Sequence, residues 1–215
     1  MKLQKIGGVG SIGFACLCAI FLVFNLLVFP RLGLVESSDW IDAVKINAAW
    51  STSPITFVLF NLEPILFSIA LILIALALRE RMQAGMPNLM QIVVIGVSIA
   101  CALLLAAALI EITTSPTIAS AQNLSTRRAV TAMYFGLIFA GDHALGWVLL
   151  LIGWAALKTK ELPRILSYLL LLYGIIAALE FAVHPFMFVG VILGIIWGVW
   201  LGVVLLRKPG SYVGS

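Results

Sequence analysis

Charged side chains are scarce in this chain: they make up 10% of its 215 residues, whereas hydrophobic residues make up 63% and the mean hydropathy is +1.17. A soluble globular domain has about 25% charged residues, so this composition excludes a soluble fold. The apolar runs also lack the alternation of polar and apolar residues that a membrane barrel requires. Composition therefore predicts an all-α integral membrane protein that forms one domain over residues 1–215.

Motifs that would name an activity are also missing. The chain has no GxxxxGK[ST] phosphate-binding loop and no HExxH zinc motif. It has no series of intramembrane arginines, which a voltage sensor needs, and no basic stripe, which excludes a nucleic-acid partner. Its cysteines, Cys16, Cys18 and Cys101, lie in apolar runs without a CxxC pair or a disulfide framework. We interpret them as small hydrophobic residues.

Six apolar runs are long enough to cross a bilayer, because about 20 helical residues span a hydrocarbon core of about 30 Å. The last two runs are separated at His184-Pro185, since the residue before proline is pushed out of helical geometry. In the first outer loop we expect a short interfacial helix from Ser38-Asp39 through Trp50, with Trp50 against lipid headgroups. The alternative is a solvated loop with two tryptophans in the interfacial belt. The predicted spans are residues 9–29, 55–78, 89–112, 129–157, 165–183 and 186–206.

The basic residues favour one orientation of this six-helix bundle. With a cytoplasmic N-terminus, nine Lys and Arg residues lie on the cytoplasmic side and four on the other side, as the positive-inside rule expects. The C-terminus is then cytoplasmic as well. The nine residues are Lys2, Lys5, Arg79, Arg81, Lys158, Lys160, Arg164, Arg207 and Lys208, and the four are Arg31, Lys45, Arg127 and Arg128.

A few ionisable residues interrupt the apolar runs. Asp142-His143 lies near the middle of the longest run, where an ionised Asp costs roughly 2.5–3.5 kcal/mol. Glu63 precedes Arg79 by sixteen residues and Asp142 precedes Lys158 by sixteen, which predicts that the two acids lie at one level. All these residues fall in the outer half of the membrane or near its midplane. We therefore predict a polar pocket that opens to the outer face, lined by Glu63, Asp142, His143, Glu180 and His184.

Each of these residues also has a structural interpretation. Glu63 could bond carbonyls that the following proline leaves free. Asp142-His143 could make one helix–helix hydrogen bond each, and the Glu180/His184 pair could cap a turn at the interface. Glu111 lies near the end of its span, and we interpret it as solvated and structural.

Three functions are compatible with the pocket. The first, which demands least of the sequence, is a binder, carrier or membrane subunit that holds a small molecule or a lipid. The second is a metal-dependent intramembrane hydrolase with zinc held by His143, His184 and one of Asp142, Glu63 or Glu180, because catalytic zinc needs three protein ligands and an open position. The third is a b-type haem held between His143 and His184. Whether the protein is an enzyme stays open at this point.

A glycine ladder marks the last span. Gly190, Gly194, Gly198 and Gly202 recur every four residues and so fall along one side of the helix. Small residues at such positions let another helix approach closely. We predict that a helix of this chain or of a partner packs on this ladder.

The last third of the chain contains the stretches 153–157 (GWAAL), 162–166 (LPRIL) and 200–207 (WLGVVLLR). These stretches resemble a broad group of bacterial six-helix integral membrane proteins of unknown function. The resemblance implies a multi-pass protein of the bacterial inner membrane with that helix count. It implies no activity and no site residues.

Overall fold

The computed structural model describes residues 2–34, 42–120, 124–179 and 186–207, with 93% helix and no strand among them. Its helices are amply explained by the unbroken apolar runs, and two of them begin at a proline, which suits the first turn of a helix. In chain order they are α1 (Lys2–Val23), a π-helical turn η1 (Phe24–Val28), a 3₁₀ turn η2 (Phe29–Leu32), α2 (Ala43–Thr52), α3 (Pro54–Met82), α4 (Pro87–Ser120), α5 (Leu124–Thr159), α6 (Arg164–Leu179) and α7 (Phe186–Leu206).

Within the described ranges, five helical segments are long and apolar enough to cross a membrane: Lys2–Leu32, Pro54–Met82, Pro87–Thr114, Ser125–Thr159 and Phe188–Leu206. The chain is thus a multi-pass helical protein. The prediction of six full spans is not confirmed. The predicted span 165–183 corresponds to α6 up to Leu179, and residues 180–183 lie outside the described ranges; the 16 described residues of α6 extend over about 24 Å at 1.5 Å per residue.

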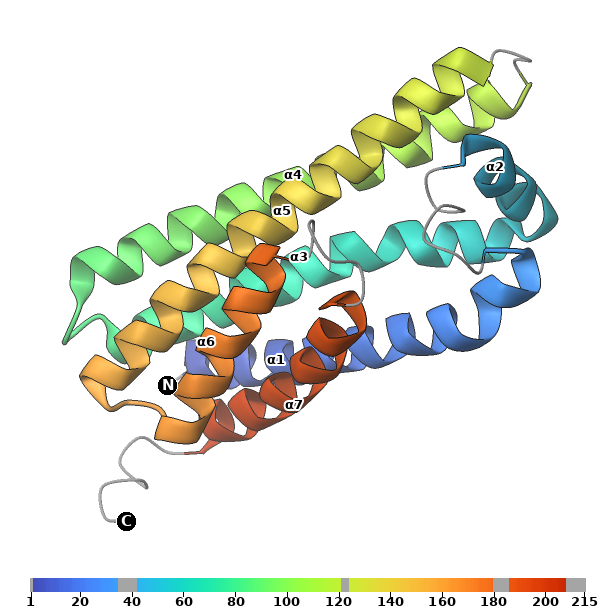
Figure 1. The fold of residues 1–215 in the computed structure, drawn as a ribbon. Helices are drawn as coiled ribbons and strands as arrows, with labels where there is room; N and C mark the ends of the chain where they lie inside the picture. Colours follow the sequence, from blue (N-terminus) through green and yellow to red (C-terminus); the bar gives the residue numbers. More distant parts are fainter. Residues whose placement is uncertain (1, 35–41, 121–123, 180–185, 208–215) are drawn as a thin grey trace.

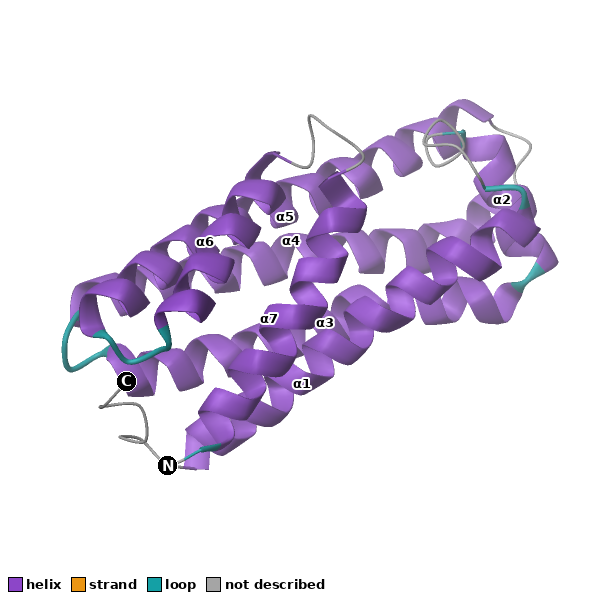
Figure 2. Cartoon of the chain, turned by 60° about the horizontal axis from the view of Figure 1, so that its bottom comes forward, coloured by secondary structure: helices purple, strands orange, loops and turns teal. Residues whose placement is uncertain are grey.

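The helices form a ring in which each packs against its neighbours, in the order α1, α3, α4, α5, α6, α7 and back to α1 (Figures 1 and 2). The start of α1 lies at the same end of the ring as the end of α7. There the Gln4 backbone N–H donates to Glu80 Oε2 at 3.2 Å, and Arg81 Nη1 donates to the Val204 carbonyl at 3.2 Å. We call this the terminal end. Helix α2 lies at the opposite end, the distal end (Figure 1).

Three glycines of the α7 ladder, Gly194, Gly198 and Gly202, are covered by α1. Ser11 Oγ donates to the Gly198 carbonyl at 2.7 Å, and a Cβ added at Gly202 would lie 3.0 Å from the Gly8 carbonyl oxygen. Helices α5 and α6 approach each other just as closely, because a Cβ at Gly146 would lie 2.5 Å from the backbone nitrogen of Ala178. These contacts leave no room for a side chain, so glycine sets the spacing of both helix pairs.

Apolar packing fills the two ends of the ring separately. At the terminal end a large core surrounds Phe14, Leu78 and Trp197. At the distal end a smaller core gathers Phe29, Ile46 and Trp50, with one face of α2 lying against α3 and α5. The space between the two cores is where the cavity described below is found.

Helix α2 replaces the interfacial helix that was predicted from Ser38-Asp39 through Trp50. Its N-cap is Asp42, whose carboxylate accepts from the Val44 backbone N–H at 2.9 Å. The predicted cap lies outside the described residues. Trp50 was expected against lipid headgroups, but its side chain is only 6% exposed because it packs within the distal core.

Glu111 is buried, which corrects the interpretation of a solvated residue. Its Oε1 accepts from Arg127 Nη2 at 3.1 Å, and the two side chains are 5% and 4% exposed. The Trp50 side chain also hydrogen-bonds to Glu111. This cluster ties α4, α5 and α2 together at the distal end, because Glu111 lies near the end of the apolar run of α4 and Arg127 lies in the first turn of α5.

Candidate functional site

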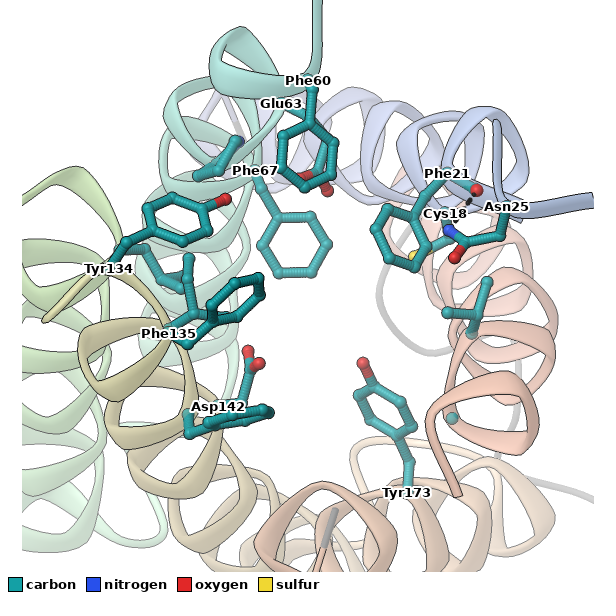
Figure 3. Close-up of a pocket in the computed structure, with 16 residues that line it drawn as sticks. Cys18, Phe21, Asn25, Phe60, Glu63, Phe67, Tyr134, Phe135, Asp142 and Tyr173 are labelled. Carbon is teal, nitrogen blue, oxygen red and sulfur yellow. Dashed lines mark hydrogen bonds between the residues drawn. The ribbon is translucent and has the colours of Figure 1, made fainter. Parts of the chain in front are cut away.

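A cavity of about 170 Å³ lies inside the ring, between the terminal and distal cores. Figure 3 looks into it. All six helices of the ring contribute to its wall, together with η1. The lining residues are Cys18, Phe21, Asn25, Phe60, Glu63, Pro64, Phe67, Leu104, Tyr134, Phe135, Ile138, Phe139, Asp142, Tyr173, Gly190 and Val191.

Two carboxylates belong to this wall. Glu63 comes from α3 and Asp142 from α5, and the Asp142 carboxylate points into the open space in Figure 3. The Glu63 carboxylate has no hydrogen-bond or ion-pair partner among the described residues. None of the described residues that line the cavity is Lys, Arg or His. Among the described lining residues, the wall therefore presents two acids and no basic side chain.

Aromatic side chains form most of the remaining surface. Seven lining residues are Phe or Tyr. The floor of the cavity toward the terminal end is a continuous layer of aromatic rings. The ring centroid of Phe14 lies 4.5 Å from that of Phe67 and 4.6 Å from that of Trp197, and the Trp197 and Tyr173 centroids are 5.6 Å apart. The Tyr173 hydroxyl points from this floor into the cavity (Figure 3). The cavity is thus an aromatic chamber with a few polar groups.

Helix α7 borders the cavity with little side-chain volume. At the cavity α7 contributes only its first turns, with Gly190 and Val191. Glycine has no side chain to fill the space, and the facing residues are left apart.

Three polar lining residues were not predicted from the sequence: Asn25, Tyr134 and Tyr173. Asn25 sits in η1, where its Nδ2 donates to the Phe21 carbonyl at 2.9 Å. π-Helical turns often occur at functional sites. The available signal was an amide in the apolar first run and the two tyrosines, Tyr134 within the run 129–157 and Tyr173 within the run 165–183.

His143 does not line the cavity, although it follows Asp142 directly. Its Nδ1 lies 2.9 Å from the Ala178 carbonyl oxygen, and its Nε2 accepts from Trp147 Nε1 at 3.0 Å. A carbonyl can only accept, so Nδ1 carries the proton and the ring is neutral. Ala178 lies in the last turn of the described part of α6. The bond from His143 to Ala178 is the helix–helix hydrogen bond that the structural interpretation expected, and we call it the cap of α6.

The predicted ligand set His143, His184, Asp142 and Glu180 is not assembled in the described residues. Glu180 and His184 lie outside them. Where the structure describes the chain, no group of three His, Cys, Asp or Glu side chains is placed to hold a metal. Both ring nitrogens of His143 already have partners, so ligation by this residue would break a contact to α6 or to Trp147.

Comparison with known proteins gives no further guide to the site: no protein-family model, no curated protein and no solved structure matches the chain.

Proposed function

We propose that this membrane protein binds a small organic cation in the central cavity, as a binder or a carrier. The observation that carries the proposal is the combination of two carboxylates, Glu63 and Asp142, with an aromatic wall and no basic residue among the described lining side chains. Ligand sites of this kind are mostly apolar with a small number of placed polar groups.

The electrostatics favour a positive ligand. Two ionised carboxylates in an apolar surrounding are costly unless a counter-charge is close. An ammonium or quaternary ammonium group supplies that charge, and aromatic faces attract it as well, by about 2 kcal/mol or more where water is excluded. Glu63 is the stronger of the two anchors in this argument, because no described residue pairs with it.

The hydrolase and the haem protein have less support. Both need His143 as a ligand, and its ring is held between α6 and Trp147. Both also need His184, which lies outside the described residues. The lining of the cavity instead supports recognition by charge and aromatic contact.

The direction of access belongs to the proposal too. We place the terminal end in the cytoplasm of a bacterial inner membrane, because the basic residues concentrate there. The cavity lies nearer the distal end, so in this orientation it opens to the outer face of the membrane. Alkaline phosphatase fused after Ser120, the last residue of α4, should be active; an inactive fusion at this position, with activity after Thr159, would reverse the orientation.

The binding experiment uses the full chain in nanodiscs of neutral phosphatidylcholine and radiolabelled phenyltrimethylammonium. We expect saturable binding that tert-butylbenzene, the uncharged isostere, does not compete for. Glu63→Gln and Asp142→Asn should each weaken binding at least about tenfold, equivalent to about 1.4 kcal/mol. Glu161→Gln is the control: Glu161 is a half-buried acid at the terminal end, paired with Arg81 at 3.5 Å and remote from the cavity lining, and this variant should bind as the unmodified protein does.

Lack of saturable binding by the folded unmodified protein contradicts the proposal. So does binding that persists in both acid variants, because the charge of the wall would then play no part.

A further inference from the structure

A second hollow lies beside the cavity. It is a groove of about 260 Å³ on the outer surface of the ring, between the first helix and α3. Its walls are apolar, and some of its side chains face the lipid: Ile20 is 51% exposed and Leu66 is 41% exposed. From the first helix it is lined by Leu17, Ile20 and Phe24, and from α3 by Leu59, Leu62 and Leu66.

The groove and the cavity share a wall. Phe21, Phe60 and Glu63 line both of them. A single layer of side chains therefore separates the acidic chamber from a lipid-facing apolar surface, and Glu63 belongs to that layer. In Figure 3, Phe21 lies on one side of the chamber, and Phe60 and Glu63 both extend from α3.

We infer that the ligand is a single-chain cationic amphiphile, with its headgroup in the cavity between Glu63 and Asp142 and its alkyl chain in the groove between α1 and α3. This inference rests on the proposed function and names its ligand class. Charge complementarity selects the headgroup, and the shared wall at Glu63 places the chain directly beside it.

The dimensions suit one alkyl chain. The groove runs from Leu17 to Phe24 on one helix and from Leu59 to Leu66 on the other, which is about 10 Å along each axis at 1.5 Å per residue. Its apolar side chains resemble the lipid tails around them, so a chain already in the bilayer can enter without crossing water. Such a ligand reaches the cavity sideways from the membrane, by displacing Phe21 or Phe60.

The test compares two cations in nanodiscs of neutral phosphatidylcholine: dodecyltrimethylammonium, which has the chain, and phenyltrimethylammonium, which lacks it. Empty nanodiscs give the background of partitioning. The variant is Leu66→Trp, which fills the groove. Ile69→Trp is the matched control, because Ile69 is also lipid-facing on α3 at 52% exposure but does not line the groove.

We expect Leu66→Trp to weaken dodecyltrimethylammonium binding at least about tenfold and to leave phenyltrimethylammonium unchanged, while Ile69→Trp alters neither. Dodecylphosphocholine, with the same chain and a zwitterionic headgroup, should compete poorly. Leu62→Trp serves as a second groove-filling variant if Leu66→Trp does not fold.

The outcomes separate the two proposals. If both groove-filling variants bind the long-chain cation as the unmodified protein does, while the short cation still depends on Glu63, the chain does not use the groove and only the present inference fails. If neither cation binds the unmodified protein, the proposed function fails with it.

Discussion

Replacing His143 by leucine tests whether this residue caps α6 or serves as a ligand. The substitution removes two contacts, from Nδ1–H to the Ala178 carbonyl at 2.9 Å and from Trp147 Nε1–H to Nε2 at 3.0 Å. Hydrogen bonds between membrane helices average about 0.6 kcal/mol and reach about 1.7 kcal/mol. Two lost bonds therefore predict a decrease of about 1–3 kcal/mol in the free energy of unfolding.

Two further variants make the prediction specific. In His143→Gln the amide can still donate to the Ala178 carbonyl and accept from Trp147, so we expect at least half of the stability to return. Trp147→Phe removes only one of the two bonds and should cost about half as much as His143→Leu, roughly 0.6–1.5 kcal/mol. Reversible unfolding in mixed micelles, followed by circular dichroism, measures all three.

A leucine variant as stable as the unmodified protein would refute the capping role. The capping role would also be refuted if His143→Leu lost more of a bound metal, or of a visible absorption band, than it lost of folded protein, because a cap holds no cofactor. A destabilised leucine variant together with a glutamine variant that regains at least half of the lost stability is the pattern that capping requires.

Two other predictions concern the packing around the cavity. Gly146→Ala should destabilise the bundle by about 1–3 kcal/mol, because its Cβ would press against the α6 backbone. Gly136 lies on the same helix with open space around it, so Gly136→Ala should be neutral or slightly stabilising in the same micelle unfolding assay. Equal stability of the two variants would contradict the close α5–α6 contact. Arg127→Met should lower the free energy of unfolding by about 3–5 kcal/mol, because the buried Glu111 carboxylate loses its cation. Adding Glu111→Leu should recover much of that free energy. A double variant as unstable as the single one would argue against the ion pair.

Several parts of the fold follow from local sequence. Long apolar runs made the membrane helices predictable, because an unbroken run can satisfy its backbone only as a helix in lipid. The equal spacing from Glu63 and Asp142 to the basic ends of their helices predicted a common level, and both residues line one cavity. The glycine ladder on α7 predicted a close helix, since glycine admits a neighbouring backbone.

Other expectations were wrong because they depend on contacts far apart in the chain. Glu111 was placed in solvent from its position near the end of an apolar run, but Arg127 and Trp50 bury it. Trp50 was assigned to the lipid interface by composition alone, although α2 folds back onto the distal core. A single helix shows which residues are apolar, and it does not show what covers them.

The sequence by itself determined that this chain is a multi-pass helical membrane protein and roughly which segments are helical, because hydropathy and helix rise depend only on the local run of residues. The tertiary structure alone decided which face each side chain presents. Asp142 and His143 differ by about 100° around one helix, and only the positions of α6 and α3 turn one toward the cavity and the other into a helix cap.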